Sequence, residues 1–178
     1  MFASSPRFPV PQILFAVTAV IFAGSVWQSA PQLPDRVATH FNAQGEANGW
    51  MSREGHVGFL IGTGLGVSAF LVALLHSFRF FPPNTLNVPD AKFWRDPRNY
   101  PEACRIFARW SWLLAAMHLI FLGTLHSVIL AANQLSPPRL NGGAMMWQTG
   151  IFLTGIGVLI WGLFQSLRRA KVAVGSTS

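Results

Sequence analysis

The sequence is poor in cysteine, tyrosine and charged residues. Its single cysteine, Cys104, excludes an intrachain disulfide and a cysteine-rich metal cluster. Charged residues make up 11% of the chain, against about 25% in a typical soluble domain. Six residues are Asp or Glu and 13 are Lys or Arg, which gives a formal net charge of +7. This composition argues against a soluble enzyme, a disordered tail and a coiled coil.

The motifs of common enzyme classes are missing as well. The chain contains no HExxH, GxSxG, CxxC or phosphate-binding GxxxxGK[ST] pattern. No Asp or Glu lies inside its apolar stretches, so a proton- or sodium-coupled transporter would lack its usual carboxylate. These absences favour a non-enzymatic protein without a cofactor. In so apolar a chain, the excess of Lys and Arg indicates membrane topology rather than binding to nucleic acid.

The hydrophobic residues, 51% of the chain, fall into four long stretches that contain no charged residue. Each stretch exceeds the roughly 20 apolar residues that a transmembrane helix needs. We therefore predict an all-α integral membrane protein, a single domain over residues 1–178 embedded in the lipid bilayer. The first stretch is longer than the apolar region of a signal peptide, so we expect a retained anchor. The predicted spans lie near residues 11–30, 57–77, 110–131 and 147–167, separated by an outer loop at 31–56 and an inner basic loop at 78–109.

The distribution of Lys and Arg predicts the orientation of the spans. Ten of the 13 lie before the first span, between the second and third spans, or after the fourth. By the positive-inside rule, both termini are then cytoplasmic and the loop at 31–56 faces outward. The inner loop also carries aromatic residues beside its basic ones, which is typical of a segment on an anionic membrane surface.

The second predicted span carries three glycines at intervals of four residues, Gly58, Gly62 and Gly66. This spacing places them on one helix face and lets another backbone approach closely. They could pack against another helix of the same chain or form the interface of a homo-oligomer. Because three other helices are available, we expect packing within the chain.

The outer loop has the most specific composition in the chain. It contains two stretches that start at Asn and end at Gly, Asn42 to Gly45 and Asn48–Gly49. Such stretches favour turns with a positive φ. We therefore predict a compact loop in which Phe41 and Trp50 make apolar contacts inside the loop itself.

Residues 33–53, LPDRVATHFNAQGEANGWMSR, resemble the pattern LPxxVxxHFxxxGxxxGWxSK of the bacterial domain-of-unknown-function family DUF1648. That family also forms the N-terminal part of SdpI-type immunity proteins. Asn48 stands where many members have Asp, and Arg53 replaces the usual Lys. Residues 86–94, LNVPDAKFW, resemble a second segment of the family through Asn87, Pro89 and Trp94. The resemblance implies a bacterial inner-membrane protein, and it suggests immunity, envelope signalling or stress as the class of function. The matching positions of the loop motif are Leu33, Pro34, Val37, His40, Phe41, Gly45, Gly49, Trp50 and Ser52.

These observations lead to a first hypothesis, in which the outer loop recognises a ligand or a membrane-protein partner. The candidate residues for recognition are His40, Phe41, Asn42, Gly45, Gly49 and Trp50, with Asn87, Pro89 and Trp94 as a further candidate segment in the inner loop.

Three histidines support a second hypothesis, a metal-binding membrane enzyme or metal handler. His40 and His56 flank the outer loop, and His126 lies about one and a half turns below the outer surface in the third span. If the loop folds back, the three imidazoles meet, and zinc or copper accepts such a set of ligands. A third hypothesis is an accessory subunit of a larger membrane complex.

Overall fold

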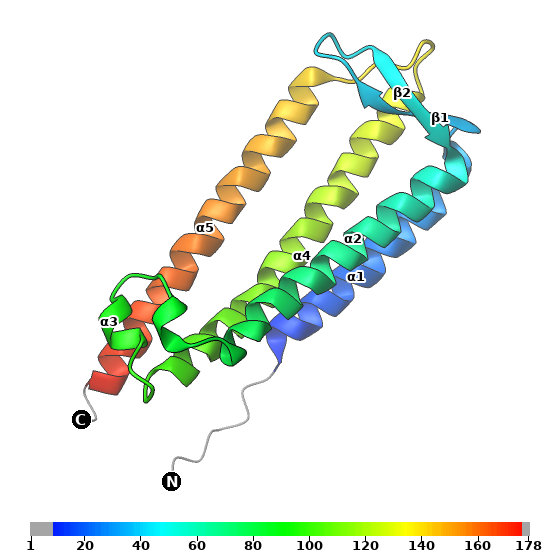
Figure 1. Cartoon of the computed structure of the whole chain (residues 1–178). Coiled ribbons are helices and arrows are strands. Elements are labelled where there is room, and N and C mark those ends of the chain that lie inside the picture. The colour runs from blue at the N-terminus through cyan, green and yellow to red at the C-terminus, as the bar shows by residue number, and fades with distance from the viewer. Residues whose placement is uncertain (1–8, 176–178) are drawn as a thin grey trace.

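The computed structural model describes residues 9–175 and is dominated by four long helices. They are α1 (Val10–Ser29), α2 (Arg53–His76), α4 (Tyr100–Asn133) and α5 (Gly142–Gly175). All four are long and apolar enough to cross a membrane, which confirms the four predicted helices. The helices alternate in direction, so the two ends of the described chain lie at the same end of the bundle (Figure 1).

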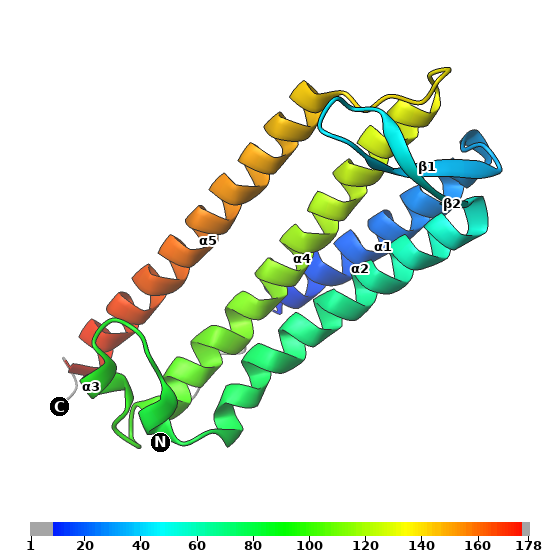
Figure 2. The ribbon, with the colours of Figure 1, turned by 45° about the horizontal axis from the view of Figure 1, so that its top comes forward.

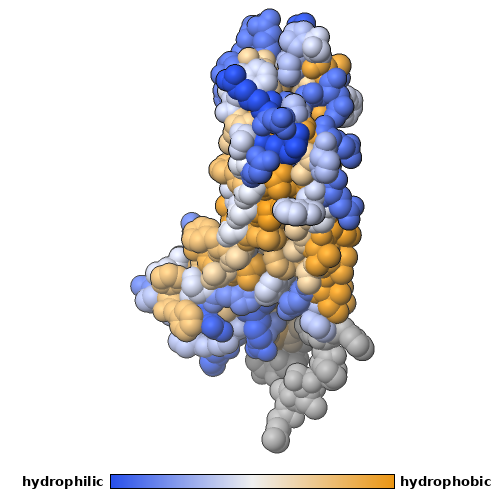
Figure 3. Space-filling view, turned by 90° about the vertical axis from the view of Figure 1, so that its right-hand side faces the viewer, coloured by the Kyte–Doolittle hydropathy of each residue, from blue (hydrophilic) through white to orange (hydrophobic). Residues whose placement is uncertain are grey.

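Helix α4 occupies the centre of the bundle. It packs against α1, α2 and α5, whereas α5 makes its main contacts with α4. Figures 1 and 2 show α1 and α2 on one side of α4 and α5 on the other. The space-filling view shows apolar side chains over the middle of the bundle and polar ones gathered toward both ends (Figure 3). This distribution fits a bundle whose middle lies in the hydrocarbon layer.

Phe22 of α1 makes a close helix contact within the bundle. Its ring lies against Gly64 of α2, where an added Cβ would come within 2.6 Å of the ring, and against Gly123 of α4. Phe22 shares a buried apolar cluster with Leu60 and Leu119. Because lipid is as apolar as these side chains, close contact at small residues holds the helices together.

The glycines at 58, 62 and 66 make no such contact. A Cβ added at any of the three would meet nothing within 4 Å. The expectation that they pack within the chain is therefore wrong. The physical reason is that Gly64, which is two residues from both Gly62 and Gly66 and so lies on a different helix face, is the glycine that faces α1 and α4.

A two-stranded antiparallel hairpin covers one end of the bundle, so the prediction of an all-α fold is wrong in this part. Strand β1 (Arg36–Phe41) pairs with β2 (Ala47–Ser52), and the 3-10 helix η1 (Ala30–Gln32) connects α1 to the hairpin. The sequence ANGWMS of β2 contains Ala, Asn and Gly, which have low strand propensity. Its pairing with β1 comes from the turn and from the helices below.

The helix ends also differ from the predicted spans. Helix α2 begins at Arg53 rather than near 57, because the Ser52 side chain accepts a hydrogen bond from the Gly55 N–H and caps the helix. Helix α4 begins at Tyr100 rather than near 110, because Pro101 stands in the first turn, where proline is tolerated. The loop predicted at 78–109 is thus shorter, and it contains η2 (Ser77–Phe80), η3 (Pro83–Thr85) and the short helix α3 (Ala91–Trp94).

Candidate functional site: the hairpin end and its buried histidines

Asn133, at the end of α4, holds the hairpin onto the bundle. Its side-chain oxygen accepts a hydrogen bond from the Ala38 N–H at 2.8 Å, and its amide nitrogen donates to the Ala38 carbonyl at 2.9 Å. The same nitrogen donates to the Ile129 carbonyl within α4. The sequence marks Asn133 as a polar residue where a span ends, but nothing in the sequence links it to Ala38.

The turn of the hairpin is built by Asn42 and Gly45. The Asn42 side-chain oxygen accepts hydrogen bonds from the N–H groups of Gln44 and Glu46. Gly45 has a φ of +79°, which confirms the predicted positive-φ turn, and its carbonyl accepts a hydrogen bond from the Leu140 N–H at 2.8 Å. A Cβ at position 45 would lie 2.5 Å from the Leu140 carbonyl oxygen. Asn42 and Gly45 therefore shape the loop and join it to the segment that leads into α5.

Several other positions of the loop motif also have packing roles. Leu33 and Val37 are buried against the ends of the helices. Arg53 donates to the Leu33 carbonyl at 2.9 Å and to the Asp35 carboxylate at 2.7 Å, which ties the start of the loop to its end. Gly49 was predicted to lie in a turn, but it lies in β2. A Cβ added there would lie 2.7 Å from the Cβ of His40.

The exposed side of the hairpin, here called the hairpin face, consists of Arg36, His40, Asn48 and Trp50. His40 Nδ1 lies 2.6 Å from the Asn48 side-chain oxygen, and the Arg36 guanidinium lies 5.4 Å from the centre of the Trp50 ring. Trp50 is 40% exposed, and its ring contacts Arg36 of the same loop. Phe41 is half-buried. The hairpin face thus joins a cation, an imidazole, an amide and an indole on a fixed backbone.

Residues 13–63 match the family model described as Domain of unknown function (DUF1648). This match confirms the resemblance found in the sequence. It covers most of α1, the whole hairpin and the first part of α2. No curated protein and no solved structure matches the chain. The DUF1648 segment therefore supplies the hairpin end, whereas α4 and α5 lie outside the match.

Beneath the hairpin, the DUF1648 segment and α4 share a polar cluster of two buried histidines, His56 and His126, and the half-buried Ser29. His56 Nε2 lies 3.2 Å from His126 Nδ1, and His126 Nε2 lies 2.7 Å from Ser29 Oγ. Both histidines are 3% exposed. When the Ser29 hydroxyl donates to the Ser25 carbonyl, 2.8 Å away, His126 Nε2 donates to Ser29 Oγ and His126 Nδ1 accepts from His56 Nε2. No pattern in the sequence marks Ser29, the last residue of α1, as part of this cluster.

The predicted set of three histidines does not form. His56 and His126 meet, but His40 lies on the hairpin face and bonds to Asn48. Between residues 9 and 175, no group of three or more His, Cys, Asp or Glu residues could hold a metal ion. The reason is the strand register, which turns the His40 side chain away from the helices and toward the outside.

Two other histidines bond across the contact between α2 and α4. His118 lies 3.0 Å from the Ser68 hydroxyl, and His76 lies 3.4 Å from the Ser111 hydroxyl. Inside a membrane, such hydrogen bonds satisfy polar groups and fix the relative position of two helices. We read these two pairs as structural.

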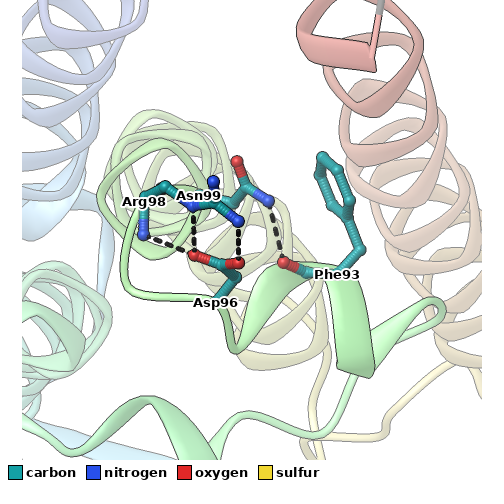
Figure 4. A network of polar contacts seen from close by, with 4 residues as sticks. All are labelled: Phe93, Asp96, Arg98 and Asn99. Atoms are coloured by element: carbon teal, nitrogen blue, oxygen red, sulfur yellow. Dashed lines mark hydrogen bonds and ion pairs between the residues drawn. The ribbon is translucent and has the colours of Figure 1, made fainter. Parts of the chain in front are cut away.

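Residues 86–94, the second segment that resembles the family, lie at the end of the bundle opposite the hairpin and are also fixed by packing. Trp94 is 1% exposed and packs with Leu86 and Leu167, whereas Asn87 and Pro89 are exposed. Figure 4 shows the turn that follows α3, in which Arg98 donates to the Asp96 carboxylate and Asn99 donates to the Phe93 carbonyl. The side-chain hydrogen bond from Arg98, together with that from its backbone N–H, lowers the pKa of Asp96 to about 2. The Asp96 carboxylate is therefore ionised at neutral pH, and its bonds to Arg98 hold the turn that leads into α4.

Proposed function

We propose that the protein is a non-enzymatic membrane protein that uses the hairpin face to recognise a ligand or a partner protein outside the bilayer. The observation that carries this proposal is the division of the loop motif into two groups of positions. Leu33, Val37, Gly45 and Ser52 have packing, turn or capping roles. His40 and Trp50 are exposed motif positions without such a role in the bundle.

The chemistry of the hairpin face fits recognition better than catalysis. A tryptophan with a stacked arginine offers a rigid, amphipathic surface of the kind that is enriched at binding hot spots. The His40–Asn48 pair adds polar groups that can bond to a partner. The resemblance to the N-terminal part of SdpI-type proteins supports immunity, envelope signalling or a stress response as the biological setting.

Photocrosslinking in intact cells tests this proposal. A photoreactive residue at position 50 should form a defined crosslinked species, which His40→Ala should weaken at unchanged protein abundance. A photoreactive residue at Trp147, an exposed tryptophan of α5, is the matched control. Equal crosslinking from positions 50 and 147, or no effect of His40→Ala, would contradict recognition by the hairpin face. A stoichiometric partner that stays bound during purification would instead identify an accessory subunit.

A second candidate function is metal handling by the buried imidazole pair, and the hydrogen bond from His126 to Ser29 favours it. A metal-binding histidine commonly donates its second ring N–H to a neighbouring group, which directs its free nitrogen at the metal. Ser29 receives that N–H in the tautomer whose Nδ1 is free, and His126 Nδ1 lies 3.2 Å from His56 Nε2. A copper(I) ion, which accepts two nitrogen ligands, would displace the proton between these two nitrogens, and the imidazoles would have to move apart from 3.2 Å to leave room for two metal–nitrogen bonds of about 2 Å each.

The metal content of purified protein tests this second function. After incubation with copper(I) and removal of unbound metal, His56→Ala and His126→Ala should each lose bound metal. His40→Ala should keep it, because His40 lies on the hairpin face. Equal metal content in all three variants and the parent protein would refute the site.

A further inference from the structure

The charged residues are distributed unequally between the two ends of the bundle. Of the described residues, the hairpin end carries three basic residues and three acidic ones, which balance. The opposite end, here called the basic end, consists of residues 77–109 and 168–171 and carries nine Lys or Arg against three Asp or Glu. Orientation by the positive-inside rule accounts for this number of cations but requires no particular arrangement of their side chains.

The acidic residues of the basic end are all used in ion pairs within the chain. Asp90 pairs with Lys171 at 2.8 Å, Asp96 with Arg98 at 2.8 Å, and Glu102 with Arg105 at 2.9 Å. Six exposed cations therefore have no acidic partner among residues 9–175. They are Arg79, Lys92, Arg95, Arg109, Arg168 and Arg169.

Two exposed aromatic rings accompany these cations. Phe80 is 74% exposed and Phe81 is 49% exposed. The Arg79 guanidinium lies 4.6 Å from the centre of the Phe80 ring. The Tyr100 hydroxyl hydrogen-bonds to the carbonyls of Phe78 and Phe81, which fixes the backbone on both sides of Phe80. The rings are thus held outward by the fold.

We propose that the basic end binds the phosphate groups of anionic phospholipids. The unpaired cations contact the headgroups, and Phe80 and Phe81 insert at the boundary between headgroups and acyl chains. The position supports this occupant, because α2 and α4 have their ends here and the headgroup layer lies at the ends of spanning helices. Charge complementarity supports it too, since each basic residue near an anionic surface contributes about 1 kcal/mol of binding, or roughly fivefold.

Lipid retention measures this binding directly. The full-length protein is reconstituted in nanodiscs that contain equal amounts of phosphatidylglycerol and phosphatidylcholine, then extracted in mild detergent, and its bound lipids are quantified by mass spectrometry. We expect enrichment of phosphatidylglycerol over phosphatidylcholine. The double variant Arg168→Gln/Arg169→Gln should lower that enrichment by about fivefold for each cation removed, or roughly 25-fold in all.

The hairpin end offers a matched control. The double variant Arg36→Gln/Arg139→Gln removes the same charge from the opposite end and should leave the enrichment unchanged. Phe80→Ser/Phe81→Ser should reduce the enrichment that survives 0.5 M salt, because apolar insertion is not screened. Helical content and monodispersity confirm that each variant is folded.

Three results would overturn the proposal. They are an absence of phosphatidylglycerol enrichment in the parent protein, equal loss in the two double variants, and displacement of the lipid by a short oligonucleotide at equal phosphate concentration. The last result would identify a general polyanion surface instead of a lipid site.

Discussion

Asn133 of α4 makes two hydrogen bonds to Ala38 of β1, and these bonds join the hairpin to the helices. It is buried and satisfies both backbone groups of Ala38, which is itself fully buried in β1. A buried backbone group that loses its partner costs about 1–3 kcal/mol. One side chain of α4 therefore controls whether the hairpin face is presented in a fixed position.

Asn133→Ala should loosen the hairpin while leaving the bundle intact. We expect faster amide hydrogen exchange over residues 36–52, corresponding to a local loss of about 1–3 kcal/mol, because the Ala38 N–H and carbonyl lose their partners. Gln134→Ala is the control, since Gln134 is an exposed neighbour whose side chain makes a single hydrogen bond, to the Gln32 carbonyl. Equal exchange over 36–52 in both variants would show that the hairpin is held by its other contacts.

Single residues show how far the sequence could predict this site. Gly45 was predictable, because an Asn-to-Gly stretch favours a positive φ in any fold. The meeting of His56 and His126 was predictable from their depth in the spans. Asn133 and Ser29 were not predictable, because their partners lie 95 and 97 residues away in the chain. No local pattern encodes such a contact.

At the scale of the element, α2 presents glycine on two sides with different surroundings. Gly64 faces the Phe22 ring, and Gly62 faces outward. The regular spacing of Gly58, Gly62 and Gly66 led to the prediction that their helix face packs within the chain, which is wrong. Spacing identifies the residues that share a helix face but not the neighbour that this face meets. The hairpin was missed for a related reason, since β2 gains its stability from pairing and burial and not from its own propensity.

The two sides of α2 give a matched pair of substitutions. Gly64→Leu should destabilise the bundle by about 1–3 kcal/mol, because the added side chain overlaps the Phe22 ring in a packed site. Gly62→Leu adds the same atoms two residues away and should leave the unfolding temperature of the monomer unchanged. Thermal unfolding in detergent and the mass of the protein–detergent complex check both. A loss of oligomer in Gly62→Leu would assign the outward glycines to an interface between copies.

At the scale of the whole molecule, hydropathy and charge were sufficient to predict four spans in their correct order. Apolar stretches between charges are long in this chain, and a bilayer demands about 20 apolar residues per helix. The exact ends were not predictable, since they depend on Ser52 as a cap and on Pro101 in a first turn. The arrangement of α5, which packs mainly on α4, depends on side-chain contacts that hydropathy does not describe.

The separation of charge between the two ends also predicts the orientation in the membrane. The basic end carries nine basic residues and the hairpin end three, so the positive-inside rule predicts that the basic end is cytoplasmic. The single cysteine simplifies the test, because Cys104→Ser gives a cysteine-free background. In that background, Gln44→Cys and Asn141→Cys at the hairpin end should react with a membrane-impermeant maleimide in intact cells. Asn87→Cys at the basic end should react only after the membrane is opened. All three positions are exposed, so a difference in labelling reports the side of the membrane and not burial.

The opposite pattern, in which Asn87→Cys is labelled in intact cells and the other two positions are protected, would show that the orientation is inverted. It would also place the hairpin face in the cytoplasm and remove the basis for recognition outside the bilayer.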